Sequence, residues 1–156
     1  MNTETRSAPD RATPLWFGAY APPAPMSGMS AVTELEGRIG RKLDVVHFYQ
    51  AWGGRWKAFD QRSLSVAGGD RAVMLSWEPW VPGGPADQAD FSLESILSPR
   101  HVGYITTWAG QLRSYGQTVY LRPMHEMNGN WYPWSGRRCR RPWKQPCTGS
   151  RGARGC

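Results

Sequence analysis

Apolar runs alternate with amphipathic segments along most of the chain. Four short runs are rich in aromatic and β-branched residues and end at Gly, Pro or polar clusters, which is typical of strands. The runs at 43–52 and 71–80 are almost continuously apolar, as in strands that are covered on both faces. The predicted strands are 15–20, 43–52, 71–80 and 117–126.

Two of the segments between these strands have helical spacing. Residues 27–42 place apolar side chains on one face, and residues 98–116 have the strongest helical pattern, with Ser98 in the N-cap position. Residues 56–70 are only weakly patterned, and residues 81–97 are predicted to be a loop.

Strands that alternate with helices predict an α/β fold with a parallel sheet, either doubly wound or closed as a barrel. Two observations favour the barrel. The first strand is followed by prolines and not by the G-x-G-x-x-G turn of a dinucleotide site. Polar and aromatic residues gather where the later strands end, which is where a (β/α)8 barrel builds its active site. We therefore expect a (β/α)8 TIM barrel, truncated to roughly its first four βα units.

The stretch LRPMHEMNGNWYPW, residues 121–134, places a carboxylate between a histidine and an aromatic cluster. In that setting desolvation is expected to raise the pKa of Glu126, so that it carries a proton near neutral pH. Such an acid can donate its proton to a glycosidic oxygen. We expect His125 and Asn128 to orient that carboxyl or to bind sugar hydroxyls. The aromatic residues offer flat faces on which sugar rings can pack: Trp131, Tyr132 and Trp134.

A purely structural alternative exists for the same residues. The tryptophans at the strand ends can cap the barrel, and Glu126 can pair with Arg122.

The stretch 121–134 resembles the fourth-strand motif of glycoside hydrolase family 26, whose best-known members are endo-β-1,4-mannanases. The shared features are Arg-Pro, a hydrophobic residue, His-Glu, Asn-Gly and the Trp/Tyr/Trp cluster. FGAY, DVVHFYQAW and MLSWEPW also resemble the first three barrel strands of that family. The resemblance covers about residues 15–135 and implies a (β/α)8 barrel with retaining hydrolysis of a β-linked polysaccharide or oligosaccharide, mannan most often.

The resemblance also implies roles for individual residues. Glu126 matches the general acid/base of the family, His125 the histidine before it, and Trp131 an aromatic residue of the sugar-binding cleft. The remaining predicted substrate-binding residues are Asn128, Trp134, Tyr132, Trp77, His47 and Glu78.

A retaining glycosidase needs a second carboxylate about 5–5.5 Å from the acid to serve as nucleophile. The resemblance implies a glutamate at the end of a seventh strand, which the sequence does not contain. We therefore expect an inactive fragment, with Glu78 in a cleft or structural role. The alternative is a non-catalytic carbohydrate-binding protein that uses the aromatic strand ends.

The net charge of +7 comes from residues 136–156, which hold seven of the 19 basic residues and no acidic one. All three cysteines also lie there, without the paired spacing of a zinc site. This unpatterned basic tail is predicted to be an out-of-frame translation. Its functional alternative is a tail that binds nucleic acid or a membrane.

Residues 1–14 are predicted to be a disordered leader without the features of a signal peptide. The chain as written is thus expected in the cytoplasm, although enzymes of the family that it resembles are usually secreted. We expect no cofactor, no metal, and neither nucleic acid nor a membrane as partner.

Overall fold

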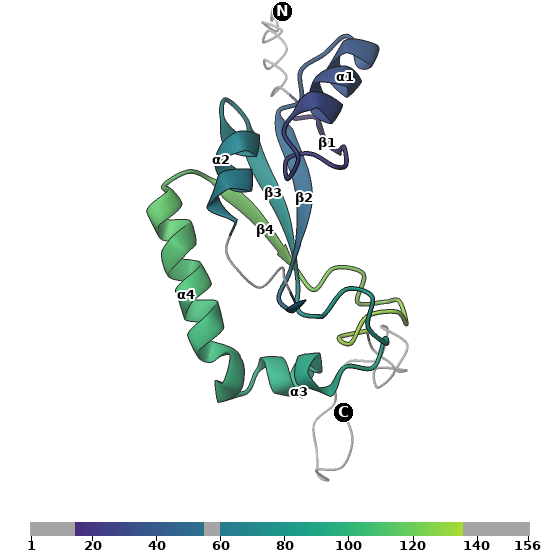
Figure 1. Cartoon of the computed structure of the whole chain (residues 1–156), viewed down its shortest axis with the longest axis vertical. Coiled ribbons are helices and arrows are strands. Elements are labelled where there is room, and N and C mark those ends of the chain that lie inside the picture. The colour runs from purple at the N-terminus through teal and green to yellow at the C-terminus, as the bar shows by residue number, and fades with distance from the viewer. Residues whose placement is uncertain (1–14, 55–59, 136–156) are drawn as a thin grey trace, which may run out of the picture.

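The structure, a computed structural model, describes residues 15–54 and 60–135. The predicted leader, 1–14, and the predicted tail, 136–156, lie outside the described residues. Four strands form one parallel sheet in which each strand lies beside the next along the chain (Figure 1). This order confirms the predicted parallel α/β sheet and is compatible with part of a (β/α)8 barrel. The strands are β1 (Gly18–Tyr20), β2 (Val45–Ala51), β3 (Ala72–Glu78) and β4 (Val119–Pro123).

Both predicted helices are present. The predicted loop at 81–97 contains a 3-10 turn and a short helix, and the structure adds a further helix between β2 and β3. Asp60 caps this helix by accepting a hydrogen bond from the Ser63 amide at 2.9 Å. Its buried face is built mostly of small residues, so the apolar periodicity of the sequence is weak. Within the described residues, no helix combines the length and the apolar character needed to cross a membrane. The helices are α1 (Ser30–Ile39), α2 (Gln61–Gly68), the 3-10 turn η2 (Ala89–Phe91), α3 (Leu93–Ile96) and α4 (Pro99–Tyr115).

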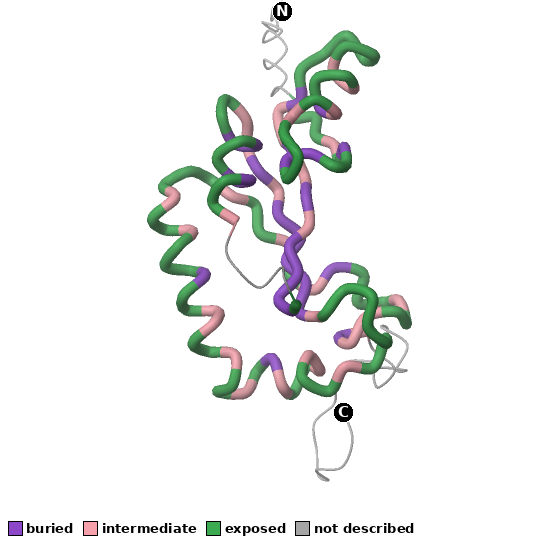
Figure 2. Tube along the Cα trace, viewed as in Figure 1, coloured by how far each residue is buried: buried purple, intermediate pink, exposed green. Residues whose placement is uncertain are grey.

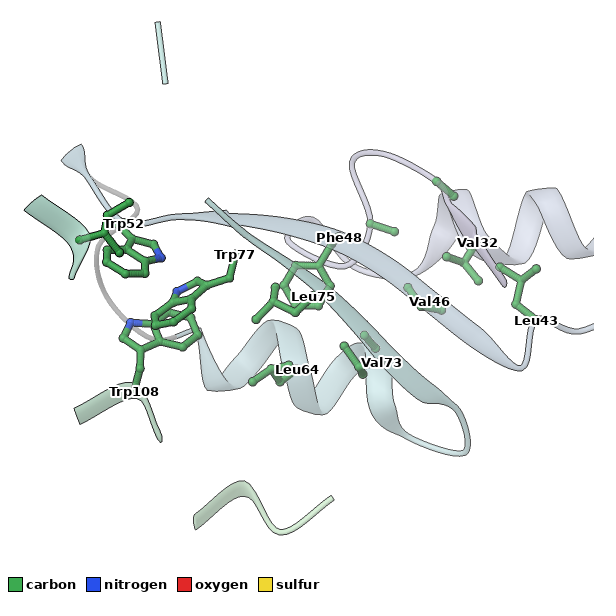
Figure 3. Close-up of a cluster of buried hydrophobic side chains, with 14 residues drawn as sticks. Val32, Leu43, Val46, Phe48, Trp52, Leu64, Val73, Leu75, Trp77 and Trp108 are labelled. Atoms are coloured by element: carbon green, nitrogen blue, oxygen red, sulfur yellow. The ribbon is translucent and has the colours of Figure 1, made fainter. Parts of the chain in front are cut away.

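The core lies between the sheet and the helices. Val32 of α1, Leu64 of α2 and Trp108 of α4 are buried in one cluster with alternate residues of the two central strands (Figure 3). Figure 2 shows the buried residues concentrated along β2 and β3, whereas α4 is mostly exposed. The strand residues of this cluster are Val46, Phe48, Val73, Leu75 and Trp77.

The opposite face of the sheet carries polar and aromatic side chains. In the strand register Tyr49 pairs with Ser76, and Ser76 with Arg122, so these three residues share that face. The rings of Trp16, just before β1, and Tyr120, in β4, meet over this face at 6.1 Å, with their planes at 90°. We call this surface the inner face.

The fourth strand ends earlier than predicted. It stops at Pro123, and the backbone then enters the left-handed region at Met124 (φ 47°) and again at Glu126 (φ 55°). Residues in this region turn the chain away from the strand direction. Glu126 consequently lies in the turn after β4 and not at the end of the strand.

Replacing Glu36 by Gln should lower the free energy of unfolding by about 1–3 kcal/mol. The Glu36 carboxylate accepts hydrogen bonds from the Leu43 amide at 2.8 Å and from Arg71 at 2.9 and 3.1 Å, which ties α1 to the start of β3. The Leu43 hydrogen bond and the Arg71 charge hold the pKa of Glu36 below its ordinary value. A lowered pKa stabilises the fold above the ordinary carboxyl pKa of about 4.3, and this contribution is lost as the pH falls through the lowered value.

Urea denaturation at pH 7 and at pH 3 would measure the effect. The difference in the free energy of unfolding between the unmodified protein and Glu36→Gln should be smaller at pH 3 than at pH 7. Glu34→Gln is the matched control, because the ion pair that Glu34 makes with Arg38, at 3.9 Å, is exposed. Equal losses for Glu36→Gln and Glu34→Gln would contradict the prediction.

Candidate active site

Glu78, the last residue of β3, lies at the centre of the candidate site. Its side chain is buried, with the residue only 6% exposed. One carboxylate oxygen, Oε1, accepts a hydrogen bond from the Tyr132 hydroxyl at 3.1 Å, and Oε2 accepts one from the Trp80 indole at 3.3 Å. Burial raises the pKa of Glu78, the nearby negative charge of Glu126 adds to the rise, and the two hydrogen bonds act against it. Glu78 is therefore a buried carboxyl held by two donors.

His125 follows β4 and packs against the same tyrosine. It is 6% exposed, and its Nε2 lies 3.0 Å from the Tyr132 hydroxyl and 3.6 Å from Oε1 of Glu78. Burial, and then the positive charge of Arg122, lower the pKa of His125, so the ring is neutral at pH 7. Its Nδ1 is buried and has no hydrogen-bond partner within the described part of the chain.

The aromatic residues after β4 form a packed support for His125. The rings of Tyr132 and Trp134 stack with centroids 4.2 Å apart and planes 10° apart. The Trp134 indole donates a hydrogen bond to the His125 carbonyl at 2.8 Å, and Trp80 packs edge-on against Tyr132 at 4.9 Å. Because Trp134 is only 2% exposed, it supports the site and offers no free face to a sugar ring. That differs from the prediction for Trp134.

Glu126 is exposed, which corrects the expectation that its carboxyl is desolvated. Its Oε2 accepts a hydrogen bond from the Trp131 indole at 3.0 Å, and Trp131 as a whole residue is 52% exposed. Asn128 is exposed in the same turn. No ion pair joins Glu126 to Arg122 among the described residues, so the structural alternative for Glu126 lacks its proposed partner. Glu126 and Trp131 are thus the accessible pair of the site.

His47 connects the site to the inner face of the sheet. Its Nε2 lies 2.8 Å from the Ser76 hydroxyl, and its ring packs against Tyr49, with centroids 4.7 Å apart. Tyr49 in turn packs against His125, with ring centroids 5.4 Å apart. Burial, and after it the Arg122 charge, lower the pKa of His47. The predicted residues His47 and His125 are therefore linked through Tyr49.

Tyr49 and Arg122 contribute to this site, although neither is among the predicted catalytic or substrate-binding residues. The signal that could have found them is strand periodicity. In the observed register Tyr49, Ser76 and Arg122 are neighbours across three strands, on the face that carries His47.

Trp77 lies on the other face of the sheet, which differs from the prediction that it is a substrate-binding residue. Its ring packs against Trp52 at 4.4 Å and against Trp108 of α4 at 5.2 Å, and the residue is 6% exposed (Figure 3). Successive residues of a strand point to opposite faces, so Trp77 and Glu78 cannot both face the site. Glu78 faces it, and Trp77 belongs to the core.

No group of three or more His, Cys, Asp or Glu side chains is placed to hold a metal ion among the residues that the structure describes. The chemistry that the site can offer is proton transfer by carboxyl and imidazole groups and packing of an apolar ring face.

The sequence is similar to part of a known glycoside hydrolase. No family model matches the sequence. Over 121 residues, 78% of this chain, the sequence is 31% identical to endoglucanase H of Acetivibrio thermocellus. The matched part is 12% of that protein, so the chain spans only a small part of the length of this relative. The chain is therefore a homologue of one segment of a glycoside hydrolase.

Proposed function

We propose that this chain provides the acid/base half of a (β/α)8 glycoside hydrolase of the family 26 type, acting on β-linked backbone sugars with retention of configuration. The observation that carries the proposal is the pairing of an accessible carboxyl, Glu126, with a half-exposed indole, Trp131, just beyond the carboxyl end of a parallel strand. Active sites of (β/α)8 barrels are built at that end.

The proposed roles follow the geometry. Glu126 gives its proton to the glycosidic oxygen and later takes a proton from the attacking water. The exposed ring face of Trp131 supports a sugar ring, and Asn128 is accessible to sugar hydroxyls. A sugar bound over Trp131 would also cover Glu126, which is exposed in the free site.

The nucleophile is proposed to come from outside the described residues. Glu78 is a poor candidate, because its two carboxylate oxygens are bound by Tyr132 and Trp80 and it is buried. We further propose that residues 15–135 are the first half of the barrel and that the chain alone binds sugars without hydrolysing them. The predicted leader and out-of-frame tail remain proposals about residues outside the described part.

Two β-glycans are candidate substrates. Mannan is implied by the sequence resemblance, whereas the name of the relative, endoglucanase H, points to a glucan. Both polymers present pyranose rings that an indole face can support, so Trp131 is compatible with either.

Isothermal titration of the chain with manno- and gluco-oligosaccharides tests the proposal. We expect binding to one series, and Trp131→Ala should weaken it about tenfold, since an aromatic contact contributes up to about 1.5 kcal/mol. Trp16→Ala is the matched control, because Trp16 is also exposed but packs beside Tyr120. Absence of binding to both series, or equal losses in the two variants, would contradict the proposal.

The second candidate function, a non-catalytic carbohydrate-binding protein, is favoured by the absence of a free second carboxylate near Glu126 among the described residues. Reading the gene in all three frames past the codon of Cys156 separates the two. A frame that resumes strand and helix periodicity with a strand-ending glutamate supports the hydrolase. Closed or unpatterned frames support the binding protein.

A further inference from the structure

Three polar groups of the site form a chain that runs from Glu78 through Tyr132 to His125. The Tyr132 hydroxyl lies 3.1 Å from Oε1 of Glu78 and 3.0 Å from Nε2 of His125. The two end groups are each 6% exposed. Water therefore has little access to either end, and the three groups must satisfy one another.

A tyrosine hydroxyl has a single proton, so it can donate to only one of its two neighbours. In one arrangement it donates to the Glu78 carboxylate and accepts a hydrogen bond from Nε2–H of His125. In the other it donates to an unprotonated Nε2 and accepts from a protonated Glu78. The two arrangements place the proton of neutral His125 on different ring nitrogens.

The surroundings of Glu78 favour the first arrangement. The Trp80 indole is a donor only, and it donates to Oε2 of Glu78, while the Tyr132 hydroxyl is placed to donate to Oε1. A carboxylate with a donor on each oxygen is satisfied without a proton of its own. Burial, as the largest effect, leaves the pKa of Glu78 raised on balance, and the two hydrogen bonds and the charge of Arg122 act against that rise.

The geometry points to Glu78 as a positioning residue that, through the Tyr132 hydroxyl, holds neutral His125 in the tautomer with its proton on Nε2. The Nδ1 atom is then an unprotonated acceptor. This atom is buried, and no residue in the described part of the chain supplies its hydrogen bond. The catalytic meaning of this assignment rests on the proposed function, whereas the tautomer itself does not.

Long-range ¹H–¹⁵N correlation spectra of the uniformly ¹⁵N-labelled chain at pH 7.5 test the inference. The sequence contains three histidines, so His47→Gln and His101→Gln assign the signals of His125 by elimination. We expect the Nε2–H pattern for His125. In Glu78→Gln the side-chain amide can donate to Tyr132, which turns the hydroxyl toward Nε2 and should convert His125 to the Nδ1–H pattern.

Two further variants keep the result interpretable. Tyr132→Phe preserves the ring that stacks on Trp134 but removes the bridge, so the preference for Nε2–H should be lost. Glu34→Gln removes an exposed carboxylate of α1 and should leave the His125 signals unchanged. An Nδ1–H pattern in the unmodified chain would overturn the inference. So would an unchanged Nε2–H pattern in both Glu78→Gln and Tyr132→Phe.

The outcome is separable from that of the proposed function. If the tautomer converts as expected but no oligosaccharide binds, Glu78 keeps its positioning role and the carbohydrate proposal fails. If oligosaccharides bind and the tautomer does not depend on Glu78, the positioning role fails and the carbohydrate proposal stands.

Discussion

Replacing Glu126 by Gln should lower kcat by about 10²–10⁴-fold in an active enzyme that contains these four βα units. The amide cannot give up a proton to the departing glycosidic oxygen, and it cannot take one from water in the second step. It has nearly the shape of the carboxylate and can still accept the Trp131 hydrogen bond through its oxygen. Reducing-end release from mannan and from β-glucan measures the effect, and KM should change much less than kcat.

A matched substrate series makes this prediction specific to acid catalysis. The dinitrophenolate group of an aryl glycoside needs no proton to depart. In Glu126→Gln the rate of the first step should therefore fall far less for this substrate than for a polysaccharide. Glu34→Gln, on the exposed face of α1, should have the activity of the unmodified enzyme. An undiminished rate of polysaccharide hydrolysis in Glu126→Gln would exclude the acid/base role.

The sheet could be predicted because its central strands are nearly continuous apolar runs, which stand out from the amphipathic segments between them. Burial on both faces is met only in part, because His47 and Tyr49 on the inner face are half-buried. Helix α2 was harder to predict because its buried face uses residues such as Ser63, Ala67 and Gly68, which give little apolar periodicity. The early end of β4 follows from positive φ angles at Met124 and Glu126, a conformation that neither residue type signals.

The candidate site was predictable only in part, because the sequence pattern does not show how the loops after the strands are oriented. The sequence grouped the polar residues at the strand ends, but it could not say that Glu126 turns outward while Glu78 is buried. The Tyr132 to Glu78 hydrogen bond joins residues 54 positions apart, and such a contact depends on how the loop after β4 folds back over β3. Strand alternation alone would have separated Trp77 from Glu78, because neighbours in a strand face opposite ways.

Trp77→Ala should lower the free energy of unfolding by about 3–5 kcal/mol, since it removes a large buried ring and leaves a cavity. The ring contacts Trp52 and Trp108, so its loss loosens the packing of α4 on the sheet. A domain of this size is stable by only about 5–15 kcal/mol, and the variant should therefore unfold at a much lower urea concentration.

Trp131→Ala is the natural counterpart, because it deletes the same side chain at a half-exposed position. Trp131→Ala should lower the free energy of unfolding by less than about 1 kcal/mol, because it removes one exposed hydrogen bond and little buried area. Each variant should therefore lose a different property. Trp77→Ala should be less stable but bind oligosaccharides normally where it is folded, and Trp131→Ala should bind oligosaccharides more weakly but be as stable as the unmodified protein. If Trp77→Ala weakened oligosaccharide binding while leaving the urea midpoint unchanged, Trp77 would be a sugar-binding residue and its assignment to the core would be wrong.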